Sequence, residues 1–245
     1  ALVADITTRM DIRRMNQPLI SPEQLQQRLL EENNIVILDA SIEFQIPSES
    51  EKIKGQMIPS AIRFDYDKDF CNKHTLLPHM FPSEKHFNTR AREIGINQDS
   101  TVVVYDNSGT FASPRAWWMF MAMGHNNVYI LDGGLPAWIK AGYATETDYR
   151  TEVKAGNFEG QIQDNHFVNA QQIQNYSDDK SANILDARSQ ARFDSEVPEP
   201  REGLRSGHIP NSICLPFAQV LNAGKLKPQE ELIDIFSTLN LTPSQ

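Results

Sequence analysis

GHIPNSICLPF, residues 207–217, has an earlier counterpart in GQMIPSAIRFD, residues 55–65. Each segment follows an apolar run that ends in Ile-Leu-Asp-Ala, at residues 37–40 and again at residues 184–187. Self-similarity of this kind indicates a repeated structural unit, and it has to be recognised before single motifs are interpreted. The sequence therefore predicts one domain used twice.

The alternation of strand-like and helix-like segments predicts the fold class. Short apolar runs, above all TVVVY at 101–105, are typical of parallel strands buried on both faces, and we expect this run to be the central strand. Segments with helical periodicity separate these runs. We predict an α/β protein with two doubly wound parallel-sheet domains, at 17–143 and 166–245, joined by a polar linker at 144–165.

The first predicted helix illustrates how the element boundaries are placed. Ser21 can cap it, Pro22 suits its first position, and Leu25, Leu29 and Leu30 form an apolar stripe. We expect this helix over 18–33. Further strands are expected at 35–38, 61–64, 101–105, 128–131, 183–186 and 212–215, and further helices at 83–94, 114–123, 135–141, 168–176 and 228–239.

Composition excludes several classes of protein. A net charge of -9 and a pI of about 5.2 argue against a nucleic-acid surface, so an anionic substrate would require a local cluster of arginines. Two cysteines form no disulfide framework, which favours a reducing compartment, and we predict the cytoplasm. We expect no signal peptide and no membrane span, because no apolar run approaches 18 residues.

The loop at 65–82 and the residue positions just beyond it contain several potential metal ligands. Cys71, His74, His79 and His86 lie within this stretch, but their spacing matches no common zinc pattern. We interpret the loop as a polar surface loop. No metal and no cofactor are expected.

Three motifs occur in family order on the repeat: SPRAWWMF at 113–120, GGLPAWIKAG at 133–142 and SGHIPNSICLPF at 206–217. Together they resemble the tandem-domain rhodanese family of thiosulfate and 3-mercaptopyruvate sulfurtransferases, over residues 18 to 245. The resemblance implies two rhodanese-like domains, of which only the second carries a nucleophilic cysteine. That cysteine accepts sulfur as a persulfide and passes it to a thiol or to cyanide.

The resemblance implies an inactive first domain. Its counterpart of the catalytic loop begins at Asp106, and a carboxylate cannot act as the sulfur nucleophile. Alignment of the two copies places the catalytic cysteine and the counterpart of 101–142 after Gln245. We therefore expect the 245-residue chain to be inactive by itself and its second domain to be ordered only when completed. Cys214 is expected to be buried in a strand and Cys71 to lie in a loop that does not activate it.

Two pairs of residues indicate the substrate. Arg192 and Arg201 are either solvated arginines or, as the resemblance implies, substrate ligands, the second of them typical of mercaptopyruvate enzymes. Arg188 and Arg205 could also shape the cleft. The resemblance further assigns supporting catalytic roles to an aspartate and a histidine, and these fall on Asp67 and His79. Asp65 is a rival for the aspartate role, and a surface position is the alternative for His79.

We predict a 3-mercaptopyruvate sulfurtransferase. Its partners would be a small anionic sulfur donor and a thiol or cyanide acceptor, with a thioredoxin-like protein among the acceptors, and neither nucleic acid nor membrane. Two alternatives stay open: a thiosulfate sulfurtransferase, and a non-catalytic rhodanese-like module that binds anions or partner proteins.

Overall fold

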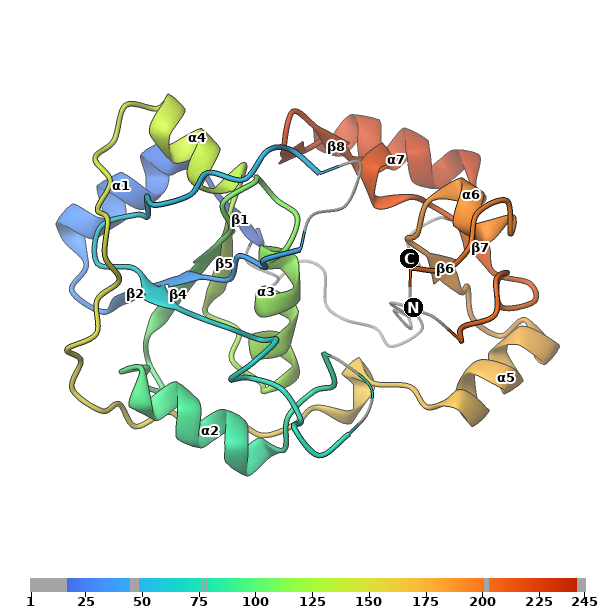
Figure 1. Cartoon of the computed structure of the whole chain (residues 1–245), viewed down its shortest axis with the longest axis horizontal. Helices are drawn as coiled ribbons and strands as arrows, with labels where there is room; N and C mark the ends of the chain where they lie inside the picture. The colour runs from blue at the N-terminus through green and yellow to red at the C-terminus, as the bar shows by residue number, and fades with distance from the viewer. Residues whose placement is uncertain (1–16, 45–48, 76, 78, 201–202, 242–245) are drawn as a thin grey trace. The chain divides into compact units, whose positions relative to one another are not determined.

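The computed structural model describes residues 17–44, 49–75, 77, 79–200 and 203–241 (Figure 1). These residues form two compact units. We call residues 17–163 with 223–226 the first unit, and residues 164–222 with 227–241 the second unit.

A parallel five-stranded sheet forms the centre of the first unit. The spatial order is β1-β5-β4-β2-β3, with β1 at Leu19–Ile20, β2 at Ile35–Asp39, β3 at Ile62–Arg63, β4 at Thr101–Tyr105 and β5 at Val128–Leu131. Every residue of β4 is buried, and it pairs with β2 from Ile35 opposite Thr101 to Asp39 opposite Tyr105. The predicted α/β class and the central place of TVVVY are confirmed.

Helices cover both faces of this sheet (Figure 1). They are α1 at Pro22–Glu31, α2 at Glu84–Glu93, α3 at Ser113–Ala122 and α4 at Gly134–Lys140. Val103 of β4 faces the cluster formed with α1 and α4, whereas Val102 and Val104 face the cluster formed with α2 and α3. Alternate residues of one strand thus supply two separate cores, which is why the run is apolar without interruption.

The start of α1 was predicted correctly at its cap and wrongly just before it. Ser21 and Gln24 form a reciprocal capping box with Pro22 at the first helical position. Leu19 and Ile20, expected in the helix, instead form edge strand β1 and pair with β5. The predicted stripe is wrong at Leu30, which is 79% exposed, because α1 turns that side of the helix to solvent.

The segment interpreted as a linker packs on the first unit over much of its length. The backbones of Met57 and Glu146 form a β-bridge. Further along, Asn88 of α2 exchanges two hydrogen bonds of 2.9 Å with the backbone of Gly160. Between these contacts Phe158 is completely buried in the cluster of α2 and α3. Residues 144–163 therefore complete the core of this unit.

The second unit repeats the start of the first. Leu185 lies opposite Ile213 and Asp186 opposite Cys214, just as Leu38 lies opposite Ile62 and Asp39 opposite Arg63. Its elements are η2 at Asp164–His166, α5 at Ala170–Asp179, β6 at Leu185–Asp186, α6 at Gln190–Phe193, β7 at Ile213–Cys214, η3 at Phe217–Val220, β8 at Leu221–Asn222 and α7 at Gln229–Thr238. Strand β9, Lys225–Leu226, belongs to the first unit.

The two sheets should differ in local stability. Amides of β4 exchange only when the core of the first unit opens, whereas β6 and β7 are two-residue strands in which three of the four side chains are partly exposed. We expect amide hydrogen exchange at 213–215 to be at least about tenfold faster than at 102–104. Equal protection in a monodisperse monomer would contradict this prediction.

Among the residues described here, no helix has both the length and the apolar character needed to cross a bilayer.

Candidate active site

The carboxyl ends of β2 and β4 meet at the point where the chain order of the sheet reverses. The chain continues from β2 to β3 on one side, whereas β4 lies on the other. Open α/β sheets bind their ligands at such a switch point. Here the loops after the two strands are joined by a 3.0 Å hydrogen bond from the Asn107 backbone N–H to the Ser41 hydroxyl.

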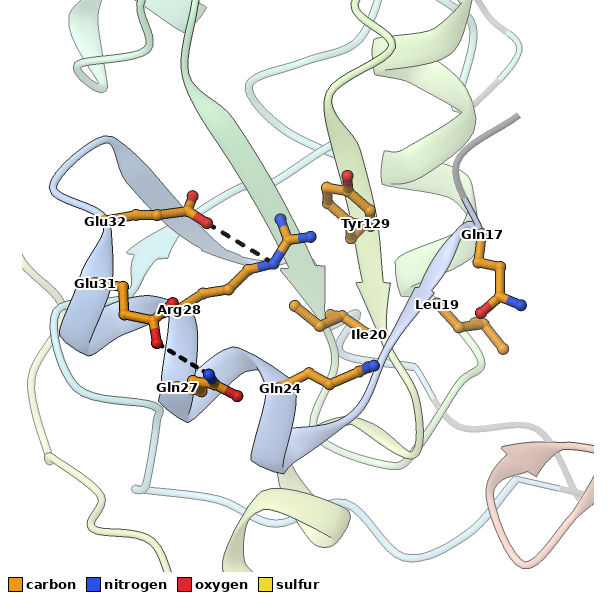
Figure 2. A pocket seen from close by; sticks show the side chains of 9 residues that line it. All are labelled: Gln17, Leu19, Ile20, Gln24, Gln27, Arg28, Glu31, Glu32 and Tyr129. Carbon is orange, nitrogen blue, oxygen red and sulfur yellow. Dashed lines mark hydrogen bonds and ion pairs between the residues drawn. The ribbon is translucent and has the colours of Figure 1, made fainter. Parts of the chain in front are cut away.

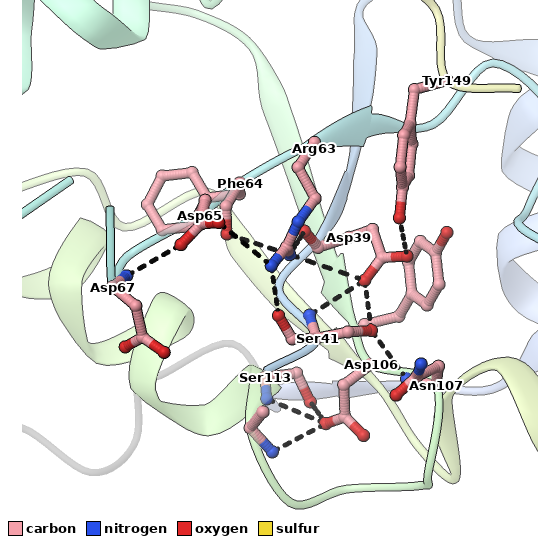
Figure 3. A network of polar contacts seen from close by, with 12 residues as sticks. Asp39, Ser41, Arg63, Phe64, Asp65, Asp67, Asp106, Asn107, Ser113 and Tyr149 are labelled. Carbon is pink, nitrogen blue, oxygen red and sulfur yellow. Dashed lines mark hydrogen bonds and ion pairs between the residues drawn. The ribbon is translucent and has the colours of Figure 1, made fainter. Parts of the chain in front are cut away.

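Asp106 directly follows β4 and is completely buried (Figure 3). Its Oδ2 accepts hydrogen bonds from the backbone N–H groups of Phe111, Ala112 and Ser113 at 2.8–3.0 Å, and from the Ser113 hydroxyl at 2.9 Å. Its Oδ1 accepts from the Ser108 N–H at 3.2 Å. The loop leading into α3 is thus an anion cradle, and the chain fills it with its own carboxylate.

The Gly133-Gly134 pair closes this cradle from α4. The Leu135 N–H donates to the Asp106 carbonyl at 2.9 Å. A Cβ at Gly134 would come within 2.3 Å of the carbonyl oxygens of Asp106 and Gly109, and its φ of +55° also suits glycine. Only glycine allows α4 to approach the loop this closely.

A second buried carboxylate, Asp39, organises the loop after β2 (Figure 3). Its Oδ1 accepts from the Ser41 N–H at 2.8 Å and its Oδ2 from the Tyr149 hydroxyl at 2.9 Å, while Arg63 donates to its carbonyl at 2.8 Å. Burial, and then the Asp39 charge, raise the pKa of Tyr149. Internal partners therefore satisfy the charges at this switch point.

Asp67 and His79, predicted as supporting catalytic residues, come together. The Asp67 carboxylate contacts Nδ1 of His79, and both side chains stay partly exposed. An ionised carboxylate can only accept, so Nδ1 donates in this contact and Nε2 takes no part in it. Asp65, the rival, instead accepts from the backbone N–H groups of Asp67 and Lys68 at 3.0 Å. The geometry thus pairs His79 with Asp67.

Arg192, predicted as a substrate ligand, lies on α6 of the second unit and is held by Glu199 at 2.5 Å. Arg188 also binds Glu199, at 2.7 Å, and Asp186, at 2.5 Å. Hydrogen bonds from Arg192 and the charge of Arg188 lower the pKa of Glu199. Arg201 lies outside the described residues. Sequence reasoning missed Glu199, although its place in the same loop as Arg201 was a usable signal.

A pocket of about 770 Å³ lies beside this cluster in the second unit. Arg188, Glu199 and Arg205 line it together with His208. The expectation that Arg188 and Arg205 could shape a cleft matches this placement, although Arg188 is already neutralised by two carboxylates.

Neither cysteine of the chain has an activated thiol. Burial raises the pKa of Cys71, which donates to the Asp67 carbonyl at 3.0 Å. Burial and the Asp186 charge raise the pKa of Cys214. Cys214 lies in β7 as predicted but is only half-buried, because that two-stranded sheet leaves it partly uncovered. A thiolate nucleophile requires the opposite shift.

The loop at 65–82 brings no metal set together in the part of the chain that the structure describes. His86 uses Nε2 to contact the Asp69 carbonyl at 2.6 Å, and His79 is held by Asp67. A separate polar pocket of about 380 Å³ lies between β1, α1 and β5 (Figure 2). There Arg28 stacks 4.8 Å from the centre of the Tyr129 ring and pairs with Glu32 at 3.9 Å. None of the predicted site residues that the structure describes lines it.

Comparison with known proteins agrees with this architecture. A rhodanese-like domain model matches residues 21–141. The chain is 37% identical to thiosulfate/3-mercaptopyruvate sulfurtransferase 1, mitochondrial, of Arabidopsis thaliana, over 89% of this chain and 63% of that protein. It is 35% identical to sulfurtransferase 2 of the same plant, over 89% and 70%. The crystal structure of SseA, a 3-mercaptopyruvate sulfotransferase of Escherichia coli, matches with a TM-score of 0.80 and 31% identity over 93% of this chain and 85% of that one.

The chain belongs to the rhodanese family of thiosulfate/3-mercaptopyruvate sulfurtransferases. It spans 63% of the length of the first of these relatives.

Proposed function

We propose that the protein is a sulfurtransferase that takes sulfur from 3-mercaptopyruvate. The contact between Asp67 and His79 is the observation that favours mercaptopyruvate over thiosulfate as the substrate, because the mercaptopyruvate members of the family resemble one another in this pair. The names of the relatives support the reaction class. We assign residues 17–143 a supporting role, because Asp106 fills the loop that would hold a nucleophile there, and residues 166–245 the substrate arginines.

The reaction that we propose balances in two steps. A cysteine thiolate of the catalytic loop attacks the sulfur of mercaptopyruvate, and a sulfur–sulfur bond forms as the carbon–sulfur bond breaks. The electron pair leaves with carbon, which takes up a proton to give pyruvate. An acceptor thiolate or cyanide then attacks the outer sulfur and releases the enzyme thiolate. His79, oriented by Asp67, would relay the proton through Nε2.

Arg192 and Arg201 would bind the substrate carboxylate and keto oxygen as a planar pair. Glu199 holds Arg192 in place before substrate arrives. The incoming carboxylate would therefore have to share that guanidinium with Glu199. Arg188 pairs with both Asp186 and Glu199, so the two arginines and two carboxylates of the described cluster carry no net charge, and the substrate anion would need the further positive charge that we assign to Arg201.

The test uses a polypeptide that includes the catalytic loop and measures thiocyanate formation from mercaptopyruvate and from thiosulfate with cyanide as acceptor. Replacing Arg201 with Ala removes a charge-assisted contact, so we expect kcat/KM for mercaptopyruvate to fall roughly ten- to a hundredfold. The effect on thiosulfate should be much smaller.

The 245-residue chain is the control, and we expect no turnover from it, because Cys71 and Cys214 both have raised pKa values. Turnover that Cys71→Ser or Cys214→Ser abolishes would contradict this expectation. Equal losses on both substrates in Arg201→Ala would favour the thiosulfate enzyme, and inactivity of the extended polypeptide would favour the binding module.

The physiological acceptor and the location follow from the same proposal. A persulfide is discharged by a reduced thiol, so a thioredoxin-like protein is our proposed acceptor. Both cysteines are free thiols, which fits a reducing compartment such as the cytoplasm.

A further inference from the structure

The backbone of His79 is held as firmly as its ring. His79 has a φ of +57°, a left-handed conformation that costs free energy in a residue other than glycine. Nη2 of Arg115, from the first turns of α3, donates to the His79 carbonyl at 2.7 Å. The carbonyl is thus fixed from the core side, and Asp67 fixes the ring from the opposite end of the same loop.

The position of Arg115 costs free energy. Its Nε is buried without a partner among the described residues, and its guanidinium stacks 4.6 Å from the centre of the Trp118 ring. Burial lowers the pKa of Arg115, an effect that Tyr66 and Asp67 oppose. A half-buried cation with an unsatisfied buried nitrogen requires an explanation beyond stability.

We propose that Arg115 is the positioning residue of the Asp67–His79 pair: it sets the His79 backbone so that Nδ1 faces the carboxylate and Nε2 stays free. Asp106 accepts a hydrogen bond from the first residue of α3, and α3 carries Arg115. The buried carboxylate therefore helps to fix the helix that holds Arg115 against His79. The catalytic consequence rests on the proposed function, whereas the geometric consequence does not.

The geometric test needs no turnover. In the 245-residue chain labelled with ¹⁵N-histidine, the His79 Nδ1–H signal is assigned by its loss in His79→Gln, and its exchange with water is measured. We expect exchange to be about tenfold faster in Arg115→Met, because the hydrogen bond to Asp67 opens more often. Arg115→Lys, which keeps a charged donor, should lie between Arg115→Met and the unmodified chain.

Arg92 provides a matched control, because it makes the same kind of bond, to the Phe158 carbonyl at 2.9 Å in the same unit. Arg92→Met should leave the His79 signal unchanged. Exchange in both Arg115 variants that equals exchange in Arg92→Met overturns the proposal. If Arg115→Met does not fold, the comparison of Arg115→Lys with Arg92→Met decides alone.

A double-mutant cycle in the polypeptide with the catalytic loop tests the consequence for catalysis. Arg115→Met should lower kcat on mercaptopyruvate about ten- to a hundredfold with little change in KM, and should add nothing in a His79→Ala background. Additive losses would show that Arg115 does not act through His79. If His79→Ala itself has no effect, the proposed role of His79 fails while the exchange result stands.

Discussion

Replacing Asp106 with Ala should destabilise the first unit by about 3–5 kcal/mol. The substitution leaves three backbone N–H groups at the start of α3, two of them in buried hydrogen bonds, without their common acceptor. Asp106→Asn keeps one acceptor oxygen but loses the negative charge, so its cost should be smaller, about 1–3 kcal/mol. All three tryptophans lie in the first unit, at 117, 118 and 138, so their fluorescence during urea unfolding reports on this unit.

Asp99 is the matched control for this substitution. It is an exposed aspartate at the opposite end of β4, and Asp99→Ala should change stability by no more than about 0.5 kcal/mol. If Asp106→Ala is as stable as Asp99→Ala, then the carboxylate does not hold the cradle together.

Replacing Phe158 with Ala should cost a similar amount, about 3–5 kcal/mol. The ring is completely buried and packs with its centre 5.8 Å from that of Phe87, 6.1 Å from that of Phe120 and 5.5 Å from that of His125. Its removal leaves a cavity under α2 and α3 and loosens the segment at 144–163. The same tryptophan fluorescence measures the loss.

Phe44→Ala is the control, because this ring is 50% exposed and its truncation should have little effect on stability. A loss below about 1 kcal/mol in Phe158→Ala would show that residues 144–163 act as a linker and contribute little to the core.

Several parts of the fold could be predicted because their signals are local. The capping box at Ser21, the β-branched run at 101–105 and the glycines at 133–134 each report on neighbouring backbone. The internal repeat was visible because Ile-Leu-Asp-Ala occurs twice, and the structure places the Leu-Asp pairs at 38–39 and 185–186 in the same strand register.

The candidate site could be predicted only in part. A resemblance pointed to Asp67 and His79, but nothing in the spacing chose between Asp65 and Asp67, since both precede the same histidine in one loop. The backbone of the turn determines which aspartate contacts His79. Asp65 accepts hydrogen bonds from the backbone N–H groups that follow it, and Asp67 faces the His79 ring.

By itself, then, the sequence determined the class of fold, the duplication and the central strand, and it placed a carboxylate directly after that strand, at Asp106. Only the tertiary structure decided that a polar segment at 144–163 carries a core phenylalanine, that Glu199 neutralises Arg192, and that Arg115 holds the His79 backbone. The physical reason is the separation along the chain between the residues that interact. Periodicity and caps depend on residues within a few positions of each other, whereas these contacts join residues far apart in the chain or in irregular loops, where side-chain partners are set by packing and charge.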